Sequence, residues 1–284
     1  MQTYTIYLGK GGVLKTQVVV ELARYCASLG KRTLVVDTDY QGDASNRLGV
    51  TATADKSLAN VLRAPSPARA LADNVFEAAP CLWVAPASLD LADVEADLEK
   101  RKVGRMTVLR NALRNREDFD VVVVDCPTSL NYLTFNALLA GGGQGKVIVP
   151  CEPEPACMRH LVNLYAILAE FAGVPTEEAV QLKGWNALNE AAAAYDSEFD
   201  PPTIAALLAT KVETRALLHR AGVELLRGSV IAYGALTPKL PEGTFAEVEA
   251  IEFPPFLGSI PKTKAASNEA VRAAYAAAFS KLIV

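Results

Sequence analysis

A glycine-rich segment, YLGKGGVLKTQ at residues 7–17, stands between a β-branched run at 3–8 and an amphipathic run that Gly30 ends. Glycines in such a loop let successive backbone N–H groups face one concavity, and the helix that follows presents its positive N-terminal end to the same point. Lys15 and Thr16 match the lysine and hydroxyl that contact phosphates and magnesium in the pattern GxxxxGK[ST]. The segment therefore predicts a phosphate-binding loop, and a plain glycine turn is the alternative.

Leu14 occupies the position where this pattern holds its last glycine. If the backbone there needs a positive φ angle, a leucine costs about 1 to 2 kcal/mol. Its side chain also adds bulk beside the nucleotide. We expect binding and slow hydrolysis to be retained, and the alternative is a nucleotide-binding scaffold with little turnover.

Near-continuous apolar segments predict buried strands at 31–39, 119–127, 145–153 and 203–210. Helix-type segments separate them, and this alternation indicates a mostly parallel twisted sheet with helices on both faces. In such sheets ligands bind at the carboxyl ends of the strands. We therefore expect an α/β fold of the P-loop NTPase type, as a single domain over residues 1–284.

Composition argues against several classes of protein. No apolar run approaches the roughly 20 residues of a membrane span, and no signal-like segment opens the chain, so we expect a cytoplasmic protein. The five cysteines form no CxxC pair and the two histidines stand apart from other ligand patterns, which argues against structural zinc. The net charge of −4 argues against a uniformly basic nucleic-acid-binding protein but permits a local basic patch.

The motifs carry a family resemblance. KGGVLKT resembles the deviant Walker A motif KGGVGKT of the ParA/MinD ATPases, and VVDTDYQGDAS at 35–45 resembles the VDxDPQGNAS segment of that family. The ParA branch fits better than MinD, because the C-terminal segment is not a basic amphipathic membrane anchor. Further similar segments follow in the same order as in the family, at 82–98, 119–140, 147–164 and 257–270.

The resemblance implies an ATP- and Mg²⁺-dependent homodimer that binds DNA nonspecifically and segregates plasmid or chromosomal DNA on the nucleoid with a ParB-like adaptor. A positioning ATPase for a protein assembly is the alternative. Lys10 would reach the phosphates of the partner subunit, Asp39 would position the attacking water, and Thr16, Asp37 and Asp125 would hold magnesium. The predicted catalytic residues are Lys10, Lys15 and Asp39, and the predicted nucleotide-binding residues are Gly9, Lys10, Gly11, Gly12, Val13, Leu14, Lys15, Thr16, Gln17, Pro150 and Pro261.

Three further segments each carry a prediction. Lys211, Arg215 and Arg220 are the predicted DNA contacts, although a solvated helix face explains such charges equally well. Residues 173–203 are longer than the usual link in this family and predict a helical insertion, either for a partner or without a role. The segment 268–284 predicts a helix docked on the core.

Overall fold

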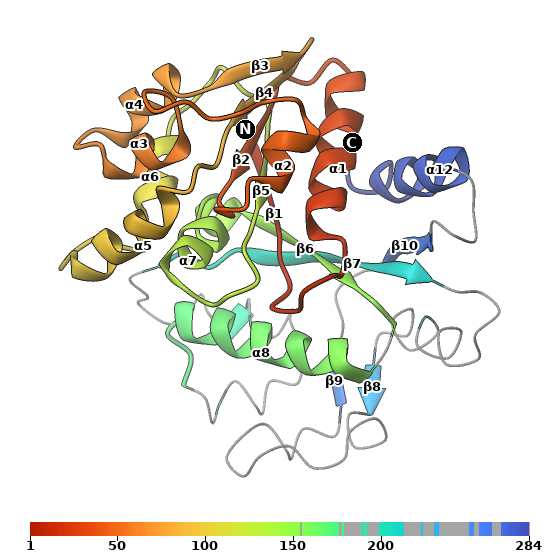
Figure 1. Cartoon of the computed structure of the whole chain (residues 1–284). Helices are drawn as coiled ribbons and strands as arrows, with labels where there is room; N and C mark the ends of the chain where they lie inside the picture. The colour runs from red at the N-terminus through yellow and green to blue at the C-terminus, as the bar shows by residue number, and fades with distance from the viewer. Residues whose placement is uncertain are drawn as a thin grey trace. The chain divides into compact units, whose positions relative to one another are not determined.

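The computed structural model describes residues 1–153, 155–175, 178, 188, 190–191, 199–212, 223, 230–232, 250–252, 256–262 and 268–283. The chain divides into a first compact unit built from Met1–Val147 and a second built from Ile148–Leu282 (Figure 1). Each unit is described by itself.

The first unit is built on a sheet that runs in the order β1-β5-β2-β4-β3. β1 pairs with β5, and β2 pairs with β5 and β4, all in parallel, while β3 is antiparallel to β4. Every residue of β2 and β5 is buried, as expected for valine-rich strands covered on both faces. The strands are β1 (Gln2–Ile6), β2 (Thr33–Asp37), β3 (Phe76–Ala79), β4 (Leu82–Ala85) and β5 (Val121–Asp125).

Helices cover both faces of this sheet, as the sequence predicts. α1 packs on β1, β2 and β5, and α6 and α7 lie on the opposite face (Figure 1). The two groups belong to crossovers that run in opposite directions along the sheet, and right-handed crossovers then place them on opposite faces. The helices are α1 (Lys15–Ser28), α2 (Asp43–Arg47), α3 (Leu58–Arg63), α4 (Pro67–Asp73), α5 (Leu91–Lys100), α6 (Val108–Leu113) and α7 (Tyr132–Leu138), followed by the 3₁₀ turn η1 (Gly142–Gln144).

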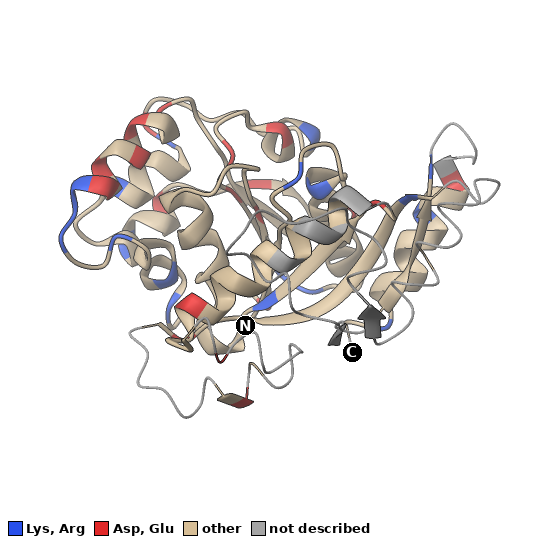
Figure 2. Cartoon of the chain, turned by 90° about the horizontal axis from the view of Figure 1, so that it is seen from below, with Lys and Arg blue, Asp and Glu red and all other residues tan. Residues whose placement is uncertain are grey.

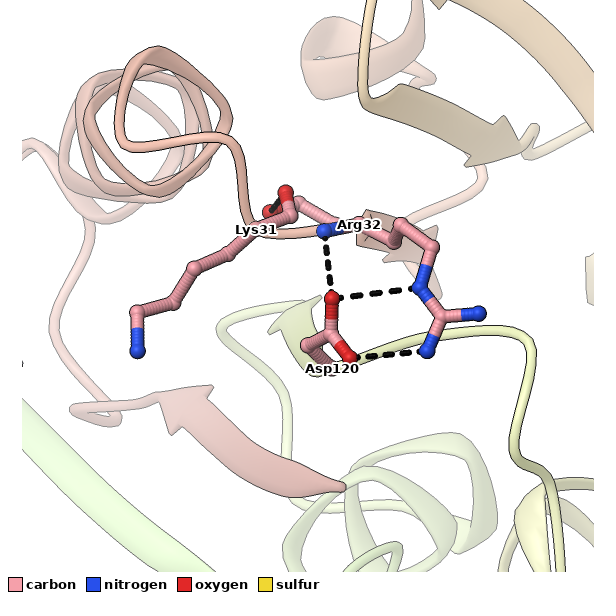
Figure 3. Close-up of polar contacts among 4 residues, drawn as sticks. Lys31, Arg32 and Asp120 are labelled. Carbon is pink, nitrogen blue, oxygen red and sulfur yellow. Dashed lines mark hydrogen bonds and ion pairs between the residues drawn. The ribbon is translucent and has the colours of Figure 1, made fainter.

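An ion pair fixes the amino ends of β2 and β5. Arg32 donates hydrogen bonds to both carboxylate oxygens of Asp120, from Nε at 3.2 Å and Nη2 at 2.8 Å, and its backbone N–H donates a third at 2.8 Å (Figure 3). The backbone N–H groups of Asp120 and Val121 donate in return to the Arg32 carbonyl. The contact supports the register of the two strands at the edge opposite the predicted site.

The second unit has a parallel pair, β10 (Phe256–Pro261) on β7 (Thr203–Val212). α12 (Asn268–Phe279) packs on β10 and buries Tyr275 and Phe279, so the prediction of a docked C-terminal helix is confirmed. The remaining elements are β6 (Lys146–Cys151), which leads into this unit, α8 (Pro155–Phe171), and the antiparallel pair β8 (Val230–Ala232) and β9 (Ala250–Glu252).

The α/β fold with a mostly parallel sheet is confirmed. Within the described ranges, no helix is both long enough and apolar enough to span a membrane. Figure 2 shows Lys and Arg interspersed with Asp and Glu over the described part of the chain.

Candidate nucleotide-binding site

The loop between β1 and α1 contains two residues with left-handed backbone conformations. Gly12 has a φ of 77°, and Leu14, the residue before α1, has a φ of 68° and a ψ of 28°. Leu14 therefore occupies the left-handed region, which costs a leucine about 1 to 2 kcal/mol. Neighbouring contacts stabilise this conformation: Val13 is fully buried, and the Leu14 carbonyl accepts a 2.9 Å hydrogen bond from the backbone N–H of Val18.

Lys15 folds back onto this loop. Its Nζ donates to the backbone carbonyls of Leu8 at 3.1 Å and Lys10 at 3.0 Å, and the residue is only 7% exposed. Burial lowers the pKa of Lys15, and the nearby Cys126 and Asp125 oppose that shift. The ammonium group is thus held against the loop backbone at the start of α1. Gly11 leaves open space beside the loop, because a Cβ atom added to it would meet no atom within 4 Å.

Two carboxylates meet at the carboxyl ends of β2 and β5. Asp37 and Asp125 are register partners on these adjacent strands, and both are buried. Burial raises the pKa of Asp37 to about 6, although two hydrogen bonds from Ser45 oppose the shift. Burial also raises the pKa of Asp125 well above its ordinary value, and the neighbouring Asp37 raises it further. The site therefore holds two acids whose ionised forms are disfavoured by burial, and for Asp125 the nearby Lys15 opposes the shift only in part.

Asp125 has the environment expected of a cation-binding group. Among the described residues, neither of its buried carboxylate oxygens has a hydrogen-bond partner, although the Thr16 hydroxyl lies near enough to lower its pKa. Buried, unsatisfied carboxylate oxygens are costly unless a ligand or an ion satisfies them. Thr16, Asp37 and Asp125 thus fit Mg²⁺, which binds through few protein oxygens and keeps waters and substrate phosphates as its other ligands. No cluster of three His, Cys, Asp or Glu side chains suited to a metal occurs in the described ranges.

Asp39 begins the turn that leads into α2. Its Oδ1 accepts a 3.1 Å hydrogen bond from the backbone N–H of Gln41, and its carbonyl accepts one from Gly42, whose φ is 67°. Asp39 is half-buried, whereas Asp37 is fully buried. The structure thus brings the predicted acids together at one edge of the sheet, with Asp39 the more accessible.

Three contacts at this site were not predicted. Ser45, in α2, donates to Asp37 through both its backbone N–H and its hydroxyl. Thr38 Oγ1 donates to the Asp125 carbonyl at 2.5 Å, which ties β2 to β5. Arg47 Nη1 donates to Gln17 Oε1 at 2.5 Å, linking the last residue of α2 to the first turn of α1. The only sequence signal for such contacts is the polar segment that follows Asp37 and Asp39.

Other predicted site residues lie in the second unit. Pro150 is a buried residue of β6, and Pro261 ends β10, so their part in nucleotide binding stays a prediction. Lys211 is in β7 with a φ of 52°, and its Nζ lies 3.5 Å from Glu152 Oε2. Arg215 and Arg220 lie outside the described residues, as does most of the predicted insertion at 173–203.

Comparison with known proteins decides the family. Residues 1–180 match the AAA_31 family, which is described as an AAA domain. The chain belongs to this family. This AAA domain is 39% identical over 161 residues to the chromosome-partitioning ATPase Soj of Thermus thermophilus, covering 57% of the chain and 59% of that protein. It is 35% identical over 167 residues to the chromosome partitioning protein ParA of Caulobacter vibrioides, covering 58% of the chain and 61% of that protein.

The predicted resemblance to ParA-type ATPases is thus confirmed for the AAA domain. The alignments span less than two thirds of the length of these curated relatives. Among solved structures, cobyrinic acid a,c-diamide synthase of Mycobacterium smegmatis, with a bound ATP analogue and magnesium, is 25% identical with a TM-score of 0.67, covering 99% of this chain and 94% of that one. A plasmid partition protein of Borrelia burgdorferi, 16% identical, has a TM-score of 0.66 and covers 99% and 97%, and it supports the fold alone.

Proposed function

We propose that this protein is a partition-type ATPase that binds Mg²⁺ and ATP at the loop between β1 and α1 and hydrolyses ATP slowly. The observation that carries the proposal is the convergence of three features: the left-handed loop, Lys15 held against it, and the unsatisfied carboxylate of Asp125. Relatives named as partitioning ATPases and a neighbour solved with an ATP analogue and magnesium support this choice.

Phosphate binding follows from the loop and the lysine. A phosphate would accept the hydrogen bonds that Lys15 now gives to the carbonyls of Leu8 and Lys10, and it would lie at the positive end of α1. The loop needs little rearrangement, because its strained residue already has the required conformation. Preorganisation of this kind lowers the cost of binding.

Thr16, Asp37 and Asp125 would hold Mg²⁺, which supplies positive charge that stabilises the transferring phosphoryl group. Two hydrogen bonds from Ser45 would hold the Asp37 carboxylate in place for binding Mg²⁺. The half-buried Asp39 is the proposed group that positions the attacking water, because it belongs to the same edge but is not enclosed. Slow turnover is proposed because Leu14 adds a side chain where a glycine would leave the loop open.

Assembly and cargo form the finer part of the proposal. The chain would form a homodimer with ATP, with Lys10 reaching the phosphates of the partner subunit, and the dimer would bind DNA nonspecifically through Lys211, Arg215 and Arg220. We propose that the two compact units form one ATPase domain over residues 1–284. The protein would act in the cytoplasm, on the nucleoid, together with a ParB-like adaptor. The names of the relatives support a part in chromosome partitioning, and the lysine at position 10 supports contact with the phosphates of a partner subunit.

Sedimentation with Mg²⁺ and either ATP, ADP or no nucleotide tests the assembly. We expect the wild type to form a dimer with ATP but not with ADP or without nucleotide. Lys10→Ala should bind nucleotide without forming a dimer. Lys15→Ala should neither bind nucleotide nor form a dimer. Lys31→Ala, another lysine of the first unit, is the matched control. A gel shift with plasmid DNA should require ATP. If dimer formation or DNA binding does not depend on the nucleotide, the proposed ATP-dependent assembly is wrong.

A further inference from the structure

The short helix α2 lies beside α1 and connects it with the buried acid of β2 (Figure 1). At the end of α2, Arg47 Nη1 donates a 2.5 Å hydrogen bond to Gln17 Oε1, and the Arg47 carbonyl accepts one of 3.1 Å from Arg24 Nη2. Two residues earlier in the chain, Ser45 donates its two hydrogen bonds to Asp37. The helix is thus held by α1 at its end and holds Asp37 from its middle.

The position of α2 depends on such contacts. The helix has five residues, of which Ala44 and Ser45 are buried. A helix of this length is not stable by itself in water, and Gly42, the residue before it, has a left-handed backbone conformation. The polar contacts of Arg47 with α1 therefore help to set where Ser45 lies.

The Gln17 amide is oriented for its contact with Arg47. Its Nε2 donates a 2.8 Å hydrogen bond to Glu21 Oε1, so its oxygen is the atom that accepts from Arg47. Gln17 directly follows Thr16, whose hydroxyl lies near enough to Asp125 to lower the pKa of that carboxyl. The link from α2 therefore reaches the residue next to a proposed Mg²⁺ ligand.

These contacts close a ring around the proposed Mg²⁺ site. Asp37 and Asp125 are register partners on β2 and β5, so the ring returns to Thr16. Mg²⁺ demands near-octahedral geometry, and loss of a group that orients its ligands commonly weakens metal binding by about 10- to 100-fold. In order, the members of the ring are Thr16, Gln17, Arg47, Ser45, Asp37 and Asp125.

We propose that Arg47 is a positioning residue for the Mg²⁺–nucleotide site, because it holds Gln17 directly and Ser45 through α2. The two ends of this link keep the ligands Thr16 and Asp37 in the arrangement that Mg²⁺ needs. The inference rests on the proposed function, since Mg²⁺–ATP is the ligand of that site. An arginine with a merely structural role would instead affect nucleotide binding equally with and without the metal.

Binding of the fluorescent analogue mant-ATP tests the proposal, with Mg²⁺ varied in one series and replaced by EDTA in another. In Arg47→Ala, the Mg²⁺ concentration for half-maximal binding should rise about threefold to tenfold, and Ser45→Ala, one step nearer the metal, should raise it further. The nucleotide affinity of Arg47→Ala in EDTA should equal that of the wild type. Arg69→Ala, at an exposed arginine of α4, is the matched control.

A double-mutant cycle tests the link through α1. Gln17→Met keeps the length of the side chain but removes its amide, and it should change the Mg²⁺ dependence as much as Arg47→Ala does. The double variant should lose no more than either single variant. Additive effects would overturn the proposal, because Gln17 would then act on the site without Arg47.

The outcomes separate this inference from the function on which it rests. If the wild type binds no mant-ATP, or binds it without regard to Mg²⁺, the proposed function fails and the positioning role fails with it. If the wild type binds Mg²⁺–mant-ATP but Arg47→Ala has the same Mg²⁺ dependence, or loses affinity equally in EDTA, only the positioning role is overturned. If Arg47→Ala does not fold, Arg47→Met, which keeps the apolar stem, takes its place in both series.

Discussion

Ser45 donates two hydrogen bonds to the same carboxylate oxygen of Asp37, from its backbone N–H at 2.8 Å and from its hydroxyl at 2.6 Å. The hydroxyl oxygen also accepts a 3.2 Å hydrogen bond from the backbone N–H of Ala87. One small side chain thus connects the end of β2 with α2 and with the segment after β4. The position of the buried acid depends on this contact.

Replacing Ser45 by alanine should lower the free energy of unfolding by about 1 to 3 kcal/mol, because it removes a buried hydrogen bond to a carboxylate and leaves the Ala87 N–H unsatisfied. Urea unfolding measures the change. Ser28→Ala, which removes an exposed hydroxyl, should stay within about 0.5 kcal/mol of the wild type. Equal effects of the two substitutions would show that Ser45 does not hold Asp37.

Replacing Leu14 by glycine should raise the free energy of unfolding by up to about 1 kcal/mol, since relief of left-handed strain exceeds the added entropy of the unfolded chain. Cys81→Gly is a matched control, because Cys81 also has a positive φ, of 60°, but lies between β3 and β4. Both substitutions should stabilise the protein, and only Leu14→Gly should change ATP turnover. A loss of stability in Leu14→Gly would contradict the strain that we assign to this residue.

The contact between Gln17 and Arg47 should appear as a coupling between α1 and α2. Gln17 also donates to Glu21 at 2.8 Å, so its amide bridges two charged side chains. A double-mutant cycle with Gln17→Ala and Arg47→Ala should give an interaction energy of about 0.5 kcal/mol in urea unfolding. Strictly additive effects would mean that the two helices are not coupled through this pair.

The ion pair between Arg32 and Asp120 gives a dependence of stability on pH. Hydrogen bonds from Arg32 lower the pKa of Asp120 from 3.8 to about 2, so the pair stabilises the folded state above pH 3.8 and loses this effect as the pH falls toward 2. Because the pair is exposed, Asp120→Asn should cost about 1 kcal/mol or less at pH 7.

Urea unfolding between pH 7 and pH 3 measures this difference, which should shrink below about pH 4. If the difference in the free energy of unfolding between wild type and Asp120→Asn stays constant over this pH range, the ion pair is not its cause.

The sequence predicted the elements of the site because each has a local signal. Valine runs predicted β2 and β5, and the glycines with Lys15 predicted the loop. A positive φ at Leu14 was only a condition that the sequence raised, and the structure meets it. The residues of the loop are contiguous, so their proximity follows from the chain itself. For these elements, periodicity and loop chemistry are sufficient.

The contacts between elements could not be predicted in the same way. That Asp37 and Asp125 are register partners depends on the insertion of β5 between β1 and β2, which is set by long-range packing. The part of Ser45 depends on where the short helix α2 lies after its turn.

ATP hydrolysis is the activity that the loop, Lys15 and the buried carboxylates of this site are proposed to support. Phosphate release by the purified protein with Mg²⁺ and ATP should be measured with and without nonspecific DNA, beside Lys15→Ala and Leu14→Gly. We predict slow turnover by the wild type, none by Lys15→Ala, and faster turnover by Leu14→Gly. If neither the wild type nor Leu14→Gly hydrolyses ATP, the ATPase account is contradicted, and the protein is at most a nucleotide-binding scaffold.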